Sequence, residues 1–254
     1  MKNVYFISDA HLGSLATGHR RSQERRLVRF LDEIKPHAAA LYMLGDMFDF
    51  WYEYKYVVPK GFTRFLGKIS ELTDSGVEVH FFIGNHDLWI ADYFERECGM
   101  KVHREPLTTE IYGRLFFLAH GDGLGSRDRK FLALRALFHS RVCRRLFSAI
   151  HPRWAVWLGL HWAKHSRLKR VDGKELPFLG AEREPLVRFA RSYLATHPEI
   201  NYFIFGHRHI ELDLPLAPSS RLIVLGEWIS LFTYAVFDGD HLYLENYIEG
   251  ESRP

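Results

Sequence analysis

The chain has 254 residues, of which 47% are hydrophobic, and a formal net charge of +3, values that fit a globular protein long enough to bury a full core. No apolar run approaches the roughly 20 residues of a membrane-spanning helix, so no helical span is predicted. A strand begins near the N-terminus and leaves no room for a signal peptide, so we expect a cytoplasmic protein whose two cysteines, Cys98 and Cys143, are free thiols.

Strands and helices alternate through the first third of the chain. The strand-like runs are apolar throughout or at every second position, whereas the helical runs repeat apolar residues every three or four. In order, the predicted elements are a strand at 3–8, a helix from about 22 to 35, a strand at 40–44, a helix at 60–74 and a strand at 77–83. This alternation predicts an α/β sandwich, and open sheets of this kind bind ligands at their strand ends.

The remainder of the chain adds more strands and a long helical stretch. The expected elements are a short helix ending near Gly99, a hairpin of 108–112 and 114–119, helices over 129–170 interrupted at Pro152, a helix at 182–196, and strands at 201–205, 221–226, 231–237 and 241–248. We therefore predict a single domain over residues 1–254, with an insertion at about 126–170 that we call the helical insert.

The helical insert has an unusual charge. It contains twelve lysine or arginine residues and the single acid Asp128, a net charge of +11, whereas the rest of the chain holds 22 basic and 30 acidic residues, a net charge of −8. Aromatic and branched side chains lie between these basic residues. Such a segment is typical of one specialised face that attracts anions.

Five of the predicted strands end in carboxylate, amide or imidazole side chains. Two divalent cations about 3.5 to 4 Å apart can activate a bridging water and clamp phosphoryl oxygens, and they need one shared carboxylate plus separate ligands on each side. The candidate ligands are Asp9, His11, Asp46, Asn85, His120, His207 and His209. Asp46 is the expected bridge, because its strand is central. A mixed oxygen and imidazole shell suits Mn²⁺, Fe or Zn²⁺.

The motifs that contain these residues resemble those of the calcineurin-like metallophosphoesterase superfamily. They are Asp9-x-His11, Gly45-Asp46, Gly84-Asn85-His86-Asp87, His120-Gly121 and Gly206-His207-x-His209, in that order. The resemblance implies an α/β sandwich of two mixed β-sheets flanked by helices. It implies Asp9, His11, Asp46 and His209 on one metal ion, and Asp46, Asn85, His120 and His207 on the other.

The same resemblance assigns further roles around the metals. It implies that His86 contacts the substrate and protonates a leaving group, that Asp87 orients His86, and that His207 belongs to the catalytic set. From the residues alone, Asp87 is equally well interpreted as the cap of a following helix. Asp49 and Trp51 are expected to pack the loop beside the metals.

A narrower set of motifs is similar to the UDP-2,3-diacylglucosamine pyrophosphatase family of lipid A synthesis. The motifs are Leu44-Gly45-Asp46-Met47-Phe48-Asp49-x-Trp51, His120-Gly121-Asp122-x-Leu124, the helical insert, and Val224-Leu225-Gly226-x-Trp228. This similarity implies a Mn²⁺-dependent hydrolase that releases UMP from a UDP-linked diacyl sugar, with the insert as a lid over the acyl chains. It implies substrate contacts from Asn85, His86, Asp128 and Ser166, and a peripheral position on the anionic inner membrane surface.

Two residues depart from that family, which usually carries Arg in place of His86 and Thr in place of Arg208. Arg neutralises a phosphate leaving group, whereas His can supply the proton that an alkoxide leaving group needs. A phosphodiester or phosphomonoester substrate therefore stays open, and so does a non-catalytic scaffold. The insert could instead be a docking surface for a partner or a second copy. Nucleic acid is disfavoured as a partner, because the positive charge lies on an apolar insert and not along a groove.

Overall fold

The computed structural model describes residues 2–16, 20–170 and 178–249, and the side chains of 166–170 are outside the description. Its first sheet contains β11 (Leu242–Asn246), β10 (Thr233–Phe237), β1 (Asn3–Ile7), β2 (Ala38–Met43), β3 (Glu78–Phe82) and β4 (Lys101–His103), in that spatial order. The strands from β1 to β4 are parallel, whereas β10 and β11 run antiparallel to their neighbours. The sheet is therefore mixed.

The second sheet is mixed as well. It contains β5 (Leu107–Ile111), β6 (Arg114–Ala119), β7 (Tyr202–Phe205), β9 (Ser220–Val224) and β8 (Leu212–Ala217), in that spatial order. The central strands β6, β7 and β9 are parallel, and the edge strands β5 and β8 are antiparallel to their neighbours. Two mixed sheets flanked by helices confirm the predicted α/β class.

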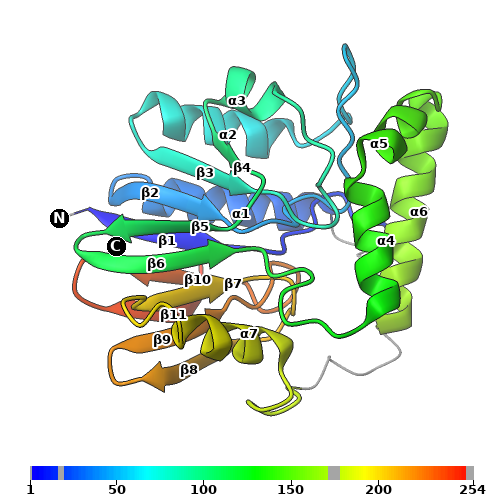
Figure 1. Cartoon of the computed structure of the whole chain (residues 1–254). Helices are drawn as coiled ribbons and strands as arrows, with labels where there is room; N and C mark the ends of the chain where they lie inside the picture. Colours follow the sequence, from blue (N-terminus) through cyan, green and yellow to red (C-terminus); the bar gives the residue numbers. More distant parts are fainter. Residues whose placement is uncertain (1, 17–19, 171–177, 250–254) are drawn as a thin grey trace.

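Alternation of side chains along the strands produces the layers of Figure 1. In β1, Val4 and Phe6 face the second sheet, whereas Tyr5 and Ile7 face the helices on the other side. Phe6 packs between the rings of Tyr42 and Phe116, at centroid distances of 5.2 and 5.7 Å. The core between the sheets is therefore joined by aromatic contacts from both.

Helices cover the outer faces of the two sheets. The first sheet packs against α1 (Arg20–Ile34), α2 (Thr63–Asp74) and α3 (Tyr93–Cys98), and the second packs against α7 (Pro185–Leu194). This arrangement leaves the carboxyl ends of the central strands uncovered by these four helices, and Figure 1 shows the helical insert standing across those ends.

The helical insert consists of α4 (Arg129–His139), α5 (Arg141–Ser148) and α6 (Pro152–Arg170). The sequence predicts a continuous helix up to Pro152, and this is wrong at Ser140. Ser140 is extended, with ψ of 139°, and its hydroxyl accepts a hydrogen bond from the Cys143 N–H, so it caps α5. Apolar spacing continues across the break, which is why periodicity does not reveal it.

Loops of the sandwich hold the helical insert through its main chain. The Tyr52 and Tyr54 hydroxyls donate to the carbonyls of Arg144 and Ile150, at 2.9 and 3.0 Å. The indole N–H of Trp89 donates to the carbonyl of Phe138 at 3.0 Å. Among the described residues, none of the helices combines the length and apolar character required to span a bilayer.

Two strands are absent from the sequence prediction. β4 has only three residues, too few for a periodic pattern. β8 contains Pro215, which is tolerated because β8 is the edge of its sheet. α7 begins at Pro185, three residues later than predicted, because proline favours the first turn of a helix.

The aromatic contacts of Phe6 predict a large loss of stability on truncation. We expect Phe6→Ala to lower the free energy of unfolding by about 3 to 5 kcal/mol, because the substitution leaves a cavity between two sheets. Urea denaturation followed by circular dichroism measures the change. As control, Ile248→Ala at a position that is 59% exposed should change it by less than about 0.5 kcal/mol. Equal effects of the two substitutions would contradict this description of the core.

Candidate metal centre

The candidate ligands meet because the strands that precede them are parallel within each sheet. Asp9, Asp46 and Asn85 follow β1, β2 and β3 of the first sheet, and His120 and His207 follow β6 and β7 of the second. The carboxyl ends of these strands lie at the same end of the sandwich. The structure thus brings together side chains up to 200 positions apart, as His11 and His209 demonstrate with Nε2 atoms 3.1 Å from each other.

The backbone at these positions is strained. Positive φ angles are rare for residues other than glycine. Eight such residues occur in the described part of the chain, and five of them are candidate ligands, namely Asp9, His11, Asp46, His207 and His209, with φ between 44° and 68°. Concentration of unusual dihedral angles in one place is typical of a functional site. No sequence pattern indicates these angles.

The first ligand group consists of Asp9, His11 and His209, whose donor atoms lie within 4.8 Å of one another. Asp9 Oδ1 is 3.2 Å from His209 Nε2 and 3.6 Å from His11 Nε2. The other oxygen of Asp9 accepts hydrogen bonds from the Ser8 hydroxyl and the His207 N–H, at 2.6 and 2.8 Å. One carboxylate oxygen is therefore held in place while the other faces the imidazoles.

The second group consists of Asp46, His120 and His207, again with donor atoms within 4.8 Å of one another. Asp46 Oδ2 lies 3.4 Å from His120 Nε2 and 3.8 Å from His11 Nε2 of the first group. This oxygen faces both groups, which is the position a shared ligand requires. Its partner Oδ1 accepts the His86 N–H at 2.8 Å.

The hydrogen bonds of His120 test whether a cation fits here. His120 Nδ1 donates to the Leu44 carbonyl at 2.8 Å, so Nε2 is the ring nitrogen whose lone pair can bind a cation once its proton is lost. That lone pair faces Asp46 Oδ2 and, at 3.3 Å, Asn85 Oδ1. Acceptor atoms that face one another repel unless a positive charge lies between them. The donor set therefore fits a cation.

Glycines allow the ligand loops to approach one another. A Cβ atom on Gly84 would collide with the Asp46 carboxylate, and one on Gly206 would collide with Ser8 and Asp9. At Gly45, a Cβ atom would lie 2.7 Å from His120 Nδ1. Any larger side chain at these positions would displace a candidate ligand.

Electrostatics keep the candidate carboxylate ligands ionised and His207 neutral, whereas at His120 burial lowers the pKa but the neighbouring Asp46 carboxylate outweighs burial and raises it well above its usual value. Burial raises the pKa of Asp9, but the imidazoles of His209 and His11 outweigh burial and hold it well below its usual range. Burial also raises the pKa of Asp46, but the neighbouring His120 imidazole lowers it by more, so the pKa of Asp46 is likewise below its usual value. Burial and the neighbouring His120 lower the pKa of His207 to about 3, so this imidazole is neutral and offers a lone pair.

A third group of possible ligands consists of His11, Asp46 and His86. The family resemblance assigns His86 to the substrate and not to a metal ion. His86 Nδ1 donates to the Asp49 carbonyl at 2.9 Å, and its ring packs edge-on to that of His11 at 4.8 Å. Asp49 is buried, and its carboxylate lies 3.6 Å from His11 Nδ1. Asp49 therefore holds both imidazoles, a role beyond packing the loop.

Asp87 has different partners from those that the sequence suggests. Its carboxylate is fully buried and accepts hydrogen bonds from four backbone N–H groups, those of Gly84, Asp46, Met47 and Phe48, at 2.7 to 3.3 Å. These partners are backbone N–H groups and not the His86 ring, and Asp87 caps no helix, because the next helix, α3, begins only at Tyr93. Asp87 therefore positions the loop that carries Asp46.

A family model described as calcineurin-like phosphoesterase matches residues 2–211. The chain belongs to the calcineurin-like phosphoesterase family. A "UDP-2,3-diacylglucosamine hydrolase" of Porphyromonas gingivalis (strain ATCC BAA-308 / W83) is 46% identical, over 96% of this chain and 97% of that protein. A protein of the same name from Pseudomonas aeruginosa (strain UCBPP-PA14) is 30% identical, over 89% and 91%. A solved dimetal phosphatase of Danio rerio aligns with a TM-score of 0.49 at 14% identity, over 96% and 95%.

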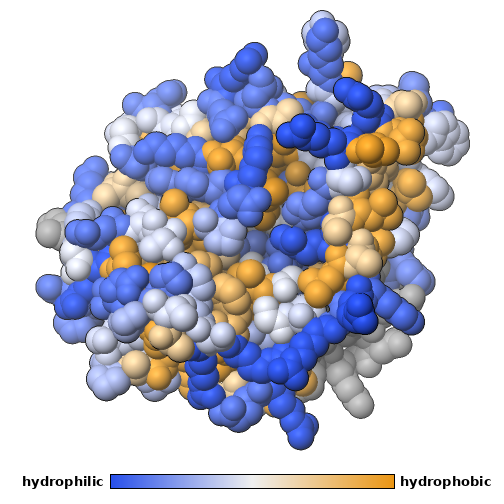
Figure 2. Space-filling view, viewed as in Figure 1, coloured by the Kyte–Doolittle hydropathy of each residue, from blue (hydrophilic) through white to orange (hydrophobic). Residues whose placement is uncertain are grey.

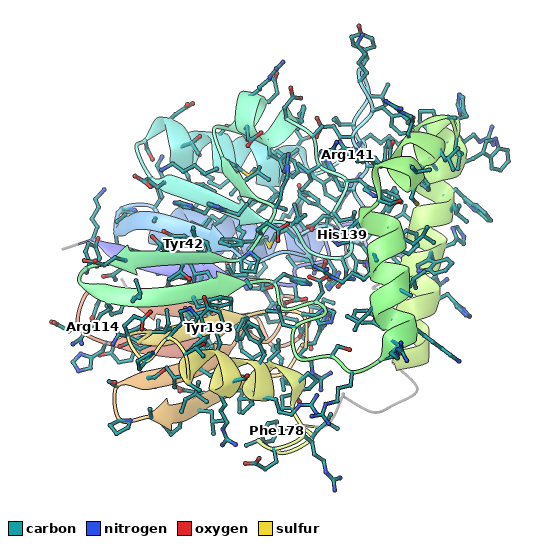
Figure 3. The ribbon with its side chains drawn as sticks, viewed as in Figure 1. Tyr42, Arg114, His139, Arg141, Phe178 and Tyr193 are labelled. Atoms are coloured by element: carbon teal, nitrogen blue, oxygen red, sulfur yellow. The ribbon has the colours of Figure 1, made fainter. Side chains whose placement is uncertain are left out.

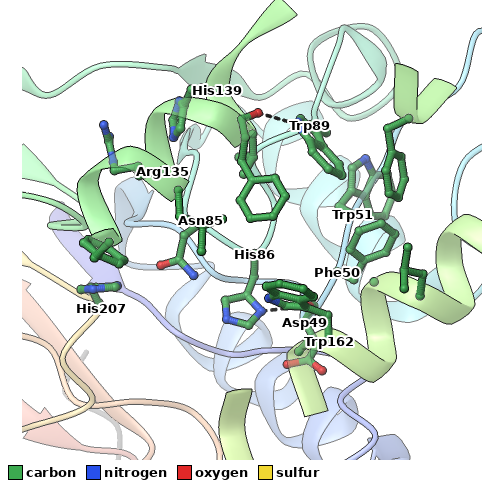
Figure 4. Close-up of a pocket in the computed structure, with 18 residues that line it drawn as sticks. Asp49, Phe50, Trp51, Asn85, His86, Trp89, Arg135, His139, Trp162 and His207 are labelled. Carbon is green, nitrogen blue, oxygen red and sulfur yellow. Dashed lines mark hydrogen bonds between the residues drawn. The ribbon is translucent and has the colours of Figure 1, made fainter. Parts of the chain in front are cut away.

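An apolar cavity of about 420 Å³ opens beside the ligands of this calcineurin-like phosphoesterase. Asn85, His86 and His207 line one part of it, and apolar side chains of the helical insert and the neighbouring loops, many of them aromatic, form most of the rest (Figure 4). We call it the apolar cavity. Its lining residues are Asp49, Phe50, Trp51, Asn85, His86, Leu88, Trp89, Phe131, Leu134, Arg135, Phe138, His139, Phe147, Leu158, Gly159, Trp162, Ala163 and His207.

Of the other two predicted substrate residues, Asp128 is absent from the described lining of the cavity, and the side chain of Ser166 lies outside the description. The Asp128 carboxylate is exposed and caps α4, accepting the N–H groups of Lys130 and Phe131 at 2.9 and 3.1 Å. Conversely, sequence reasoning did not identify Trp89, Arg135 or His139 as lining residues. Their positions depend on how α4 packs, which no motif indicates.

Metal binding should stabilise the folded chain. We expect excess Mn²⁺ to raise the melting temperature of chelator-treated protein by about 5 to 10 °C, because the ion binds only the folded state. Asp46→Asn should remove most of this rise, because it replaces the carboxylate oxygen that faces both groups with an uncharged amide group that binds divalent cations less strongly. The exposed Asp240→Asn is the control, with the full rise expected. Differential scanning calorimetry makes the comparison, and an unchanged rise in Asp46→Asn would refute the ligand assignment.

Proposed function

We propose that this phosphoesterase hydrolyses the pyrophosphate bond of UDP-2,3-diacylglucosamine, releasing UMP and 2,3-diacylglucosamine 1-phosphate. The observation that carries the proposal is the apolar cavity, which ends at Asn85, His86 and His207. A lipid held there would present its phosphate to the candidate ligands. The names of the relatives, at up to 46% identity over nearly the whole chain, support the same substrate.

Two divalent metal ions, for which we propose Mn²⁺, supply an activated water and neutralise phosphoryl oxygens when bound. The chain holds them through the two ligand groups, with Asp9, His11 and His209 in one, His120, His207 and Asn85 in the other, and Asp46 in both. Asp87 fixes the Asp46 loop through backbone N–H groups. The burial of these carboxylates keeps bulk water away from their charges.

His86 is the residue we assign to the leaving group. Its Nδ1 proton is engaged by the Asp49 carbonyl, so Nε2 is the ring nitrogen that can contact substrate. As an imidazolium, the ring donates from both nitrogens and places positive charge beside the departing phosphate. This charge does the work of the arginine that related enzymes use, so the departure at position 86 is compatible with pyrophosphate cleavage.

The helical insert suits a lipid substrate on both of its faces. Its inner face lines the apolar cavity, whereas its outer face exposes Val142, Leu146, Trp154 and Trp157 at 52 to 69%. Figure 2 shows apolar side chains gathered along the insert with hydrophilic ones at their margins. Arg141, Arg144, Arg145 and Arg153 belong to the same two helices. We propose that this face binds the anionic inner membrane surface from the cytoplasm.

The substrate assignment predicts the products. Purified Mn²⁺-loaded protein should release UMP from UDP-2,3-diacylglucosamine, measured by chromatography of the nucleotide products. His86→Ala should lower kcat by about 10²-fold or more, because a charged donor at the leaving group is lost. His241→Ala, an exposed histidine far along the chain, should match wild type. Release of UDP would place the cleavage at the sugar ester, and release of neither nucleotide would overturn the substrate.

Membrane binding is predicted separately. The protein should sediment with vesicles that contain anionic lipid more than with neutral vesicles, and added salt should weaken this, because arginines contribute. The double substitution Trp154→Ser and Trp157→Ser should reduce binding at least fivefold, whereas Ile248→Ser should leave it unchanged. Equal sedimentation with neutral and anionic vesicles would contradict the assigned role of the arginines.

A further inference from the structure

A second cavity lies on the other side of α4. Its volume is about 250 Å³, and its walls are the end of β3, the loop 103–106 and the segment 119–124, with Leu132, Arg135 and His139 of α4. We call it the polar cavity, because imidazole, guanidinium and carboxylate groups dominate its walls. Arg135 and His139 line both cavities, so one face of α4 divides them. Figure 3 places His139 on the side of α4 that faces the sandwich.

The two cavities meet at the metal centre. Asn85 lines the apolar cavity and His120 lines the polar cavity, and Asn85 Oδ1 lies 3.3 Å from His120 Nε2. Both residues belong to the second ligand group proposed above. A molecule whose centre lies on that group can therefore extend in two directions, into an apolar space on one side of α4 and a polar space on the other.

Arg135 stands at this boundary. It is the only lysine or arginine among the described side chains that line the apolar cavity. Its guanidinium pairs with the Asp122 carboxylate, which is 8% exposed, and a Cβ atom on Gly123 would lie 3.1 Å from Arg135 Cδ. The side chain is therefore held by a salt bridge on one side and by a glycine backbone on the other. A fixed guanidinium is suited to a phosphate oxygen.

The mouth of the polar cavity offers both donors and acceptors. Arg104 is anchored, since its Nη2 donates to the Ala91 carbonyl at 2.6 Å, and the Glu105 carboxylate is next to it in the loop. His103 is held by His80, whose Nδ1 is 2.9 Å from His103 Nε2, and by stacking on Phe82 at 4.6 Å. The edge of a uracil base presents two carbonyl acceptors and one N–H donor, which this combination can match.

We infer that the polar cavity binds the uridine half of the substrate, with Arg135 contacting the nucleotide phosphate at the boundary. The inference rests on the proposed function, which fixes the two ends of the substrate as diacyl sugar and uridine. The apolar cavity suits the acyl chains, so the nucleotide must leave the metal centre along the other route. About 250 Å³ lies near the lower limit of small-ligand sites, a size for a mononucleotide and not for a diacyl lipid.

The test separates base recognition from phosphate binding. Titration calorimetry on the full-length Mn²⁺-loaded protein measures the Kd of UMP and of ribose 5-phosphate, because both place a phosphate at the metals and only UMP carries a base. The wild type should bind UMP at least tenfold more tightly than ribose 5-phosphate. In Leu132→Trp, which fills the polar cavity from α4, this ratio should fall to below about three.

Matched variants control for folding and charge. Leu137→Trp lies on the same helix at a side chain that is 55% exposed and lines neither cavity, and it should keep the wild-type ratio. Arg104→Ala should lower the ratio at least threefold, whereas Arg114→Ala, the same change at an exposed position of β6 that lines neither cavity, should not. Arg135→Gln should weaken UMP and ribose 5-phosphate alike, because it acts on the phosphate. Melting temperatures identify any variant that is unfolded.

The inference and the proposed function can fail separately. A wild-type ratio near one, or a ratio that survives Leu132→Trp and Arg104→Ala in folded protein, would overturn the polar cavity as the uridine site even if the enzyme releases UMP. If the wild type binds UMP more tightly than ribose 5-phosphate, and Leu132→Trp and Arg104→Ala abolish this preference, the polar cavity is supported as the uridine site. This holds even if the protein fails to hydrolyse UDP-2,3-diacylglucosamine.

Discussion

The structure is organised by two carboxylates that carry negative charge in its interior. Asp9 and Asp46 are 0 and 2% exposed, and burial of unpaired charge is costly. Imidazoles from both sheets surround them, so each sheet supplies part of the compensation that the other requires. The two sheets are therefore joined at one end by electrostatics and along their length by contacts such as that of Phe6 with Phe116. Bound divalent cations would supply the rest of the positive charge that these two buried carboxylates require.

Strained backbone angles orient the side chains of the candidate ligands. Each positive φ angle outside glycine costs about 1 to 3 kcal/mol and persists only where the surroundings determine it. At Asp46 the determining group is Asp87, which binds the N–H groups of the whole turn, and at His207 it is Asp9, which accepts the His207 N–H. One candidate ligand thus holds the loop of another at His207, and a buried carboxylate beside the site holds the loop of Asp46. Loss of one carboxylate would relax a loop and displace a neighbouring ligand as well.

The sequence predicts the central strands and their polar ends because those features are local. Periodicity reveals β1, β2, β3, β6 and β7, and the residue after each strand is visible in the chain itself. The capped break at Ser140, the short β4 and the edge strand β8 depend on single contacts or on position in the sheet, which periodicity does not encode. The roles of Arg135 and Asp49 could not be predicted from local sequence either. That of Arg135 depends on how α4 packs beside Asp122, and that of Asp49 depends on how its aromatic loop packs against His11.

The position of the helical insert against the sandwich accounts for the two cavities that the proposed substrate would occupy. Tyr52, Tyr54 and Trp89 bind carbonyl groups of the insert, and the rings of Tyr52 and Trp89 also pack against Phe147 of α5, at centroid distances of 4.9 and 4.5 Å. Side chains of α4 line the apolar cavity, and Arg135 of the same helix lies at the boundary of the two cavities, where it pairs with Asp122. Because α4 stands across the strand ends, a single helix separates the apolar cavity from the polar cavity. The candidate metal ligands lie where the two cavities meet, which is where the proposed substrate would place the bond between its two halves.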